Sequence, residues 1–338
     1  MPPESSDPIL GAIVLVLAIA SVGTWFWLVD RLKRGPILAY EPRSPVPWHG
    51  VWTLLPILLV AFTMFAAYRG DDHVEDDASA TASDLVDRVA AGSAQQMAFV
   101  AAFLAVVIAV SGATRSDLGL PKDGHQLVGD VRIGILAWLA ALAPVYGVQV
   151  LMINLVGPTD GHPLIKIVRE HTSPLLFMLA FTAAVVVAPI CEELLFRLLL
   201  QGWLEKWEDR KRGWREAAIN DQSQLTNDEQ PMTNDEQSVA DHSAFDIRHS
   251  PVPTDQSPLR VGLGGLPYGW LPIAISSLLF ALAHIGYGPE PVPLFLLALI
   301  LGYVYQRTHR IVPCMVTHAL FNGTSLVALW RVMSASAP

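Results

Sequence analysis

Long apolar runs alternate with polar segments along most of the chain. Eight runs are candidate membrane spans, because a helix that crosses the hydrocarbon core needs about 20 predominantly apolar residues. These runs cover residues 9–29, 51–68, 97–113, 133–155, 174–200, 268–286, 294–306 and 311–330. The pattern predicts an all-α, polytopic membrane protein with about eight transmembrane helices, since helices satisfy their own backbone hydrogen bonds in lipid.

Composition supports this fold class. The 338 residues are 52% hydrophobic and only 16% charged, which is unusual for a soluble chain. The net charge of −9 comes mainly from two polar segments, 71–87 and 205–257. It therefore does not indicate a basic partner, and no feature of the chain points to nucleic acid. Cys191 and Cys314 provide neither a disulfide framework nor a metal-binding cysteine pattern.

The polar segment after the fifth run predicts a division of the chain. Residues 220–257 are acidic, poor in aliphatic side chains and repeat Thr-Asn-Asp-Glu-Gln twice, which is typical of disorder. The expected organisation is a two-span N-terminal region with an acidic loop at 1–92, a membrane core at 93–338, and a disordered insertion at about 208–260.

The distribution of basic residues predicts the orientation. Loops after the first, third, fifth and seventh runs hold 16 Lys and Arg, and the opposite side holds five. Because such an excess marks the cytoplasmic side, we expect both termini outside, in a bacterial plasma membrane. The polar insertion then lies inside.

Three charged residues interrupt the fifth run. Glu192, Glu193 and Arg197 lie within apolar sequence, and charged groups at membrane depth are treated as functional by default because they are costly there. Glu193 and Arg197 are four residues apart and share a helix face, which suits an ion pair. Glu192 lies about 100° around the helix and is left for chemistry.

Other polar side chains of catalytic type lie in later runs. His284 is in the sixth, and His318 and Asn322 are four residues apart in the eighth. A carboxylate and two imidazoles from three helices suit a hydrolytic water in two ways. They bind a divalent metal such as zinc that activates the water, or Glu192 acts as general base without a metal. The sequence does not decide between them.

The depth of His284 conflicts with a shared, shallow site. It lies about 16 residues, or roughly 24 Å at 1.5 Å per residue, from the cytoplasmic start of its run at Tyr268. Glu192 lies near the cytoplasmic end of the fifth run. Either the sixth helix starts below the cytoplasmic surface, or a cavity reaches deep into the bilayer.

These residues form three motifs in order. Glu192-Glu193-x-x-x-Arg197, Phe280-x-x-x-His284 and His318-x-x-x-Asn322 resemble the motifs of the CPBP intramembrane protease family. That family includes CAAX prenyl-protein endopeptidases and bacteriocin-processing or immunity-type relatives, also called Abi proteins. The resemblance spans residues 192–322, and earlier residues share only the family's habit of preceding spans.

The resemblance implies an all-helical membrane protease with a cavity open to the cytosol. It implies that Glu192 activates water, that His284 and His318 hold the water or a metal, and that Asn322 supports the oxyanion. The metal ligands, only if a metal is bound, would be Glu192, His284 and His318. The supporting residues would be Glu193, Arg197 and Phe280. The long insertion between the first two motifs departs from the family pattern.

The function expected from these observations is intramembrane hydrolysis of a peptide bond in a peptide or membrane-protein substrate. A non-catalytic scaffold or immunity protein that binds a partner peptide in the same cavity is the alternative. A small-solute transporter with Glu192 as proton site ranks last, because no inverted repeat or pair of interrupted half-helices is visible.

Overall fold

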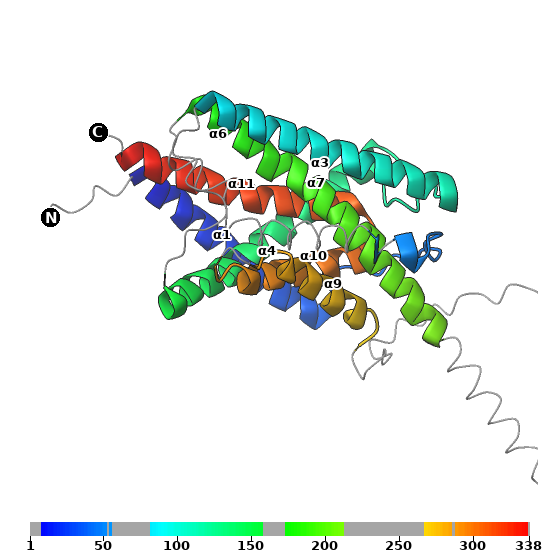
Figure 1. Cartoon of the computed structure of the whole chain (residues 1–338). Helices are drawn as coiled ribbons and strands as arrows, with labels where there is room; N and C mark the ends of the chain where they lie inside the picture. Colours follow the sequence, from blue (N-terminus) through cyan, green and yellow to red (C-terminus); the bar gives the residue numbers. More distant parts are fainter. Residues whose placement is uncertain are drawn as a thin grey trace, which may run out of the picture. The chain divides into compact units, whose positions relative to one another are not determined.

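The computed structural model describes residues 8–52, 54–55, 82–157, 173–212, 267–285 and 288–336 (Figure 1). The regular elements of these ranges include the helices α1 (Pro8–Arg34), α3 (Ala82–Ser111), α4 (Gly124–Val156), α6 (Pro174–Thr182), η2 (Ala183–Val187), α7 (Ala188–Glu193), η3 (Leu194–Gln201), α9 (Trp270–Leu282), α10 (Pro291–Thr308) and α11 (Ile311–Ser336). Residues 202–212 continue the helix after η3. The predicted all-α membrane fold is confirmed.

Six helices of the described residues are long and apolar enough to cross a membrane. They are Pro8–Arg34, Ser83–Ser111, Gly124–Val156, Pro174–Arg212, Pro291–Thr308 and Ile311–Ser334. The predicted run at 51–68 lies largely outside the described residues. The predicted run at 268–286 becomes α9, which has 13 residues and therefore extends only about 20 Å.

Local sequence explains where several helices begin and end. Asp123 caps α4 by accepting a hydrogen bond from the Gln126 backbone N–H at 2.8 Å. Gly157 ends the helix with a φ of 95°, a backbone conformation that favours glycine. Ser173 caps α6 in the same way, and Pro174 occupies its first turn, where its missing N–H costs nothing.

Helix α11 lies at the centre of the packing. It contacts α4, α10, η2 and α7, and α4 also packs against α1 and α10. The main hydrophobic cluster includes buried side chains from several helices, among them Ala141, Leu198, Leu301, Tyr305 and Phe321. Because α11 carries His318 and α7 carries Glu192, this packing brings the first and third motifs together.

Three polar segments meet at one end of the helices. The Glu41 backbone N–H donates to Arg307 O at 2.8 Å, and the Ile311 N–H donates to Gly119 O at 3.1 Å. Gly119 has a φ of 63°, and a Cβ there would lie 2.7 Å from His309 O, so only glycine fits. These segments are the loops after the first, third and seventh predicted runs, which the Lys and Arg count had assigned to one side.

Contacts divide the chain into two units. One comprises Met1–Lys206 and Pro272–Pro338, and the other comprises Trp207–Leu271. The proposed boundary at residue 92 stays a prediction. The expected insertion at about 208–260 lies largely outside the described residues.

The second unit is held together by contacts between its two ends. The Gly269 N–H donates to Glu208 Oε2 at 3.1 Å, and the Tyr268 hydroxyl donates to Asp209 Oδ1 at 2.5 Å. The Arg212 guanidinium lies 4.5 Å from the Tyr268 ring centroid. These contacts join residues on either side of the interval 213–266.

Candidate active site

The two glutamates of the first motif lie between two π-helical segments, and Arg197 lies in the second of them. Glu192 and Glu193 end α7, which η2 precedes and η3 follows. Glu193 and Arg197 are fully buried, and Arg197 Nε lies 3.2 Å from Glu193 Oε2. This is the ion pair expected from their four-residue spacing.

His318 joins the two glutamates. Its Nδ1 lies 2.9 Å from Glu193 Oε1, and its Nε2 lies 3.7 Å from Glu192 Oε2. The His318 side chain is 3% exposed and that of Glu192 is 24% exposed. Because Glu193 accepts the Nδ1–H, it fixes the tautomer of the ring and directs Nε2 at Glu192.

Glu192 is the carboxylate with spare capacity. Among the described residues, its Oε2 has no hydrogen-bond partner although the atom is buried. A separation of 3.7 Å from His318 Nε2 is longer than a direct hydrogen bond. It is short enough for one water molecule to contact both atoms.

Arg197 is fixed by its neighbours on other helices. Its Nη1 donates to the Ser276 hydroxyl at 3.0 Å, and that hydroxyl donates to Phe196 O at 2.8 Å. The guanidinium also lies 5.2 Å from the centroid of the Phe280 ring. Ser276 was not singled out in the sequence, because a serine in an apolar run carries no spacing signal.

Phe280 connects the second motif to the third. Its fully buried ring lies 5.7 Å from the His318 ring in an edge-on arrangement and 4.9 Å from the His284 ring, measured between centroids. One aromatic side chain therefore contacts both imidazoles. The length of α9 limits the depth of His284. With 13 residues, α9 is too short to carry His284 across the whole hydrocarbon core.

His284 lies in the turn that ends α9. Its backbone N–H donates to Ala281 O at 3.0 Å, which leaves Phe280 O available. His284 Nδ1 lies 2.8 Å from Phe280 O. Since a carbonyl only accepts, His284 Nδ1 is the donor in this hydrogen bond. The side chain thus closes the last helical turn.

Glu290 lies close enough to His284 to interact with it electrostatically. It immediately precedes α10, and its side chain makes no capping hydrogen bond. Burial raises the pKa of Glu290 above its ordinary value, and the charge of His284 opposes that shift. Glu290 carries no signal in the sequence, because it stands in a proline-rich turn typical of loops.

Asn322 contacts a different element. It lies one turn after His318 on α11, and its Nδ2 donates to Ala184 O in η2 at 2.8 Å. The structure thus connects Glu192, Glu193, Arg197 and His318 by direct polar contacts or close approach. Among the described residues, the Phe280 ring lies between His284 and this group. Asn322 is hydrogen-bonded to η2, the segment that precedes α7 and its glutamates.

The donor set does not fit a metal as arranged. Within the described parts of the chain, no group of three His, Cys, Asp or Glu side chains is placed to hold an ion. Glu192 and His318 supply two neighbouring donor atoms, whereas a zinc site needs at least three protein ligands.

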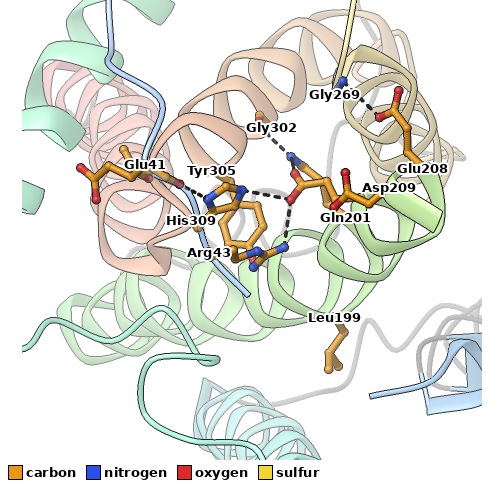
Figure 2. Close-up of polar contacts among 12 residues, drawn as sticks. Glu41, Arg43, Leu199, Gln201, Glu208, Asp209, Gly269, Gly302, Tyr305 and His309 are labelled. Atoms are coloured by element: carbon orange, nitrogen blue, oxygen red, sulfur yellow. Dashed lines mark hydrogen bonds and ion pairs between the residues drawn. The ribbon is translucent and has the colours of Figure 1, made fainter. Parts of the chain in front are cut away.

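A second charged group, the Glu205 cluster, lies at the end of the bundle where the loops meet (Figure 2). Its members are Arg43, Gln201, Glu205, Tyr305 and His309. Glu205 Oε2 lies 2.9 Å from Arg43 Nη2 and 3.3 Å from His309 Nε2, and Oε1 accepts from Gln201 Nε2 at 3.0 Å. Gln201 also donates to Gly302 O at 2.8 Å.

Arg43 belongs to the loop after α1. Its Nη1 donates to the Tyr305 hydroxyl at 2.8 Å. Burial lowers the pKa of Arg43, but Tyr305 and Glu205 more than offset this, so the pKa lies above its ordinary value. The Glu205 cluster was missed from the sequence, because Arg43 is 162 residues from Glu205 and 262 residues from Tyr305.

One comparison with known proteins gives a match. A family model described as "Type II CAAX prenyl endopeptidase Rce1-like" matches residues 174–220 and 259–324. Both matched segments together contain all seven motif residues, Glu192, Glu193, Arg197, Phe280, His284, His318 and Asn322. No curated protein and no solved structure matches the chain.

Proposed function

Because the chain belongs to the CPBP family of CAAX-type membrane proteases, we propose that it is a glutamate-dependent intramembrane endopeptidase. The observation that carries this proposal is the group Glu193–His318–Glu192. One carboxylate orients the imidazole, and a second, partly exposed carboxylate faces the other ring nitrogen. This is the arrangement expected of an oriented base beside a reacting water.

In the proposed reaction, Glu192 takes a proton from a water molecule whose oxygen attacks the substrate carbonyl carbon. Glu192 then gives that proton to the amide nitrogen as the C–N bond breaks. His318 Nε2 lies beside Glu192 Oε2 and contacts the same water. His284 offers Nε2 as an acceptor, because its Nδ1–H is used on Phe280 O. An oxyanion role for Asn322 rests on the family resemblance alone.

Glu193 and Arg197 hold this arrangement in place. Arg197 neutralises Glu193 at 3.2 Å and reaches Ser276 on α9. A buried carboxylate without such partners would take up a proton and release the imidazole. The division of roles between adjacent glutamates thus follows from their partners. Glu193 contacts His318 and Arg197 through its two oxygens at 2.9 and 3.2 Å, whereas Glu192 Oε2 lies 3.7 Å from His318 Nε2.

The proposed substrate is a peptide or a membrane protein presented at the cytoplasmic side. The family model's description makes a farnesylated peptide with a C-terminal CAAX sequence the first probe. An unprenylated transmembrane peptide is the second. The proposed orientation, with both termini outside, rests on the Lys and Arg distribution of the loops.

The test is cleavage of both probes by the purified protein in detergent, followed by mass spectrometry. The wild-type chain is expected to cleave at least one probe, and Glu192→Ala, His284→Ala and His318→Ala are expected to be inactive or severely impaired. Full activity in the Glu192→Ala variant would falsify the proposal. Binding of a probe by the wild type without cleavage would favour a non-catalytic scaffold.

A further inference from the structure

The helix that carries the two glutamates contains a carbonyl group without its usual backbone donor. In η2 the hydrogen bonds run five residues back, and the Ala188 N–H donates to Ala183 O. In the same register, the next carbonyl, Ala184 O, would pair with the N–H of residue 189. Residue 189 is proline, which has no N–H.

The missing donor comes from α11. Asn322 Nδ2 donates to Ala184 O at 2.8 Å, which is the length of an ordinary hydrogen bond. An unpaired carbonyl inside a membrane bundle is costly, so the amide compensates for the proline. Asn322 therefore has a defined partner in the protein, and that partner lies two turns before Glu192.

Helix α11 consequently holds the glutamate-bearing helix at two places. Asn322 binds it before α7, and His318 binds it at Glu193, 2.9 Å away. Asn322 and His318 share a face of α11, since they are four residues apart. A π-helical segment adds one residue to a turn, so the residues after it point about 100° away from where a continuous α-helix would place them.

We propose that Asn322 is a positioning residue that fixes the π-helical register of η2 and thereby sets the direction of Glu192 relative to His318 Nε2. The proposal rests on the proposed function, because it assigns Glu192 the role of base. It differs from an oxyanion role, in which the amide would act on the substrate. Without the Asn322 hydrogen bond, η2 is free to relax toward α-helical geometry and to turn Glu192 away.

The proline supplies a direct test. Asn322→Ala is expected to lower kcat for the probe that the wild type cleaves by about 10²-fold, as a misplacement of about 1 Å does. KM is expected to stay within about twofold of the wild-type value, because the substrate contacts are unchanged. Pro189→Ala restores an N–H at position 189 that can pair with Ala184 O, and alone it is expected to leave activity within about threefold of wild type.

The decisive measurement is the double variant Pro189→Ala/Asn322→Ala. Its kcat is expected to return to within about threefold of wild type, and the pH profile of kcat, altered in Asn322→Ala, is expected to return as well. Pro144 lies inside α4, so Asn322→Ala/Pro144→Ala is the matched control and is expected to remain impaired. Equal kcat in Asn322→Ala with and without Pro189→Ala overturns the proposal.

Two further measurements separate the possible failures. Glu192→Ala is assayed in parallel, and activity in this variant contradicts the proposed function itself. If Glu192→Ala is inactive and Pro189→Ala does not restore kcat in Asn322→Ala, only the role of Asn322 is contradicted. If Asn322→Ala does not fold, the same comparison uses Asn322→Asp. That variant keeps the size of the side chain but loses the N–H, and Pro189→Ala is expected to raise its kcat at least tenfold.

Discussion

Two groups of the same composition each include residues of the helical stretch Pro174–Arg212. At the proposed site, Glu193 contacts Arg197 and His318, and in the Glu205 cluster, Glu205 contacts Arg43 and His309. Each group contains a buried carboxylate, a guanidinium and an imidazole. Residue types alone therefore do not distinguish the proposed catalytic group from the other.

The two groups differ in what remains unused. Glu205 receives hydrogen bonds or ion pairs on both oxygens, and His309 directs Nδ1 at Glu41 O, 2.6 Å away, and Nε2 at Glu205. At the site, Glu192 adds a carboxylate whose Oε2 has no hydrogen-bond partner among the described residues. A group whose carboxylate is saturated on both oxygens stabilises the fold, whereas a group with a spare carboxylate can act on water. Substitutions in the two groups test this distinction.

The largest effect is expected at the spare carboxylate. Glu192→Gln keeps the size of the side chain but removes the proposed base, so kcat/KM for the cleaved probe is expected to fall by about 10²–10⁴-fold. The temperature of thermal unfolding in detergent is expected to stay within about 2 °C, because Oε2 makes no hydrogen bond to lose. If Glu192→Gln lowered the unfolding temperature but kept kcat/KM, Glu192 would be a structural residue and not the base.

Glu193→Gln is expected to affect both activity and stability. It leaves Arg197 buried without a counter-charge, which costs about 3–5 kcal/mol, and it no longer holds the charge that orients His318. We expect kcat to fall about 10–100-fold in the molecules that remain folded, with lower unfolding temperature. Unchanged kcat per folded molecule, measured after size-exclusion chromatography, would remove Glu193 from the proposed mechanism.

Glu205→Gln tests the saturated group. It deprives Arg43 and His309 of their shared carboxylate, so the free energy of unfolding is expected to fall by about 3–5 kcal/mol. Turnover per folded molecule is expected to stay within about twofold. Glu41→Gln is the matched control, because Glu41 is half exposed and its loss is expected to cost less than about 1 kcal/mol. A loss of turnover per folded molecule in Glu205→Gln, but not in Glu41→Gln, would show that the Glu205 cluster is not purely structural.

The smallest effect is expected at Glu290. Burial raises the pKa of Glu290 in the folded state. Once the pH exceeds this pKa, the folded protein holds a charged, partly buried carboxylate, which lowers its stability relative to low pH. Glu290→Gln is therefore expected to raise the unfolding temperature by up to about 2 °C at pH 8 and not at pH 4. An equal shift at both values would show that ionisation of Glu290 is not its cause.

Sequence reasoning found what depends on regular spacing. The apolar runs predicted the membrane helices because each run has to cover the bilayer on its own. Glu193 and Arg197 were paired because a helix brings residues four apart together. Both inferences use only local geometry, which the amino-acid order determines directly.

Contacts between distant segments were not accessible in this way. Arg43 is 262 residues from Tyr305 and 162 from Glu205, and no periodicity connects them. The π-helical segments were also missed, because adding one residue to a turn leaves an apolar run looking like any other. Pro189 was the one available signal, since a proline inside a helix forces a change in the hydrogen bonds around it.

The contacts of Glu208 and Asp209 with Gly269 and Tyr268 have a consequence for chain length. These hydrogen bonds hold the residues on either side of the interval 213–266 next to each other. The two ends of the interval are therefore connected by direct contacts as well as by the chain between them. Chain closure penalties grow only slowly with the number of residues enclosed. A change in the number of residues between these two ends is therefore expected to cost little free energy of chain closure.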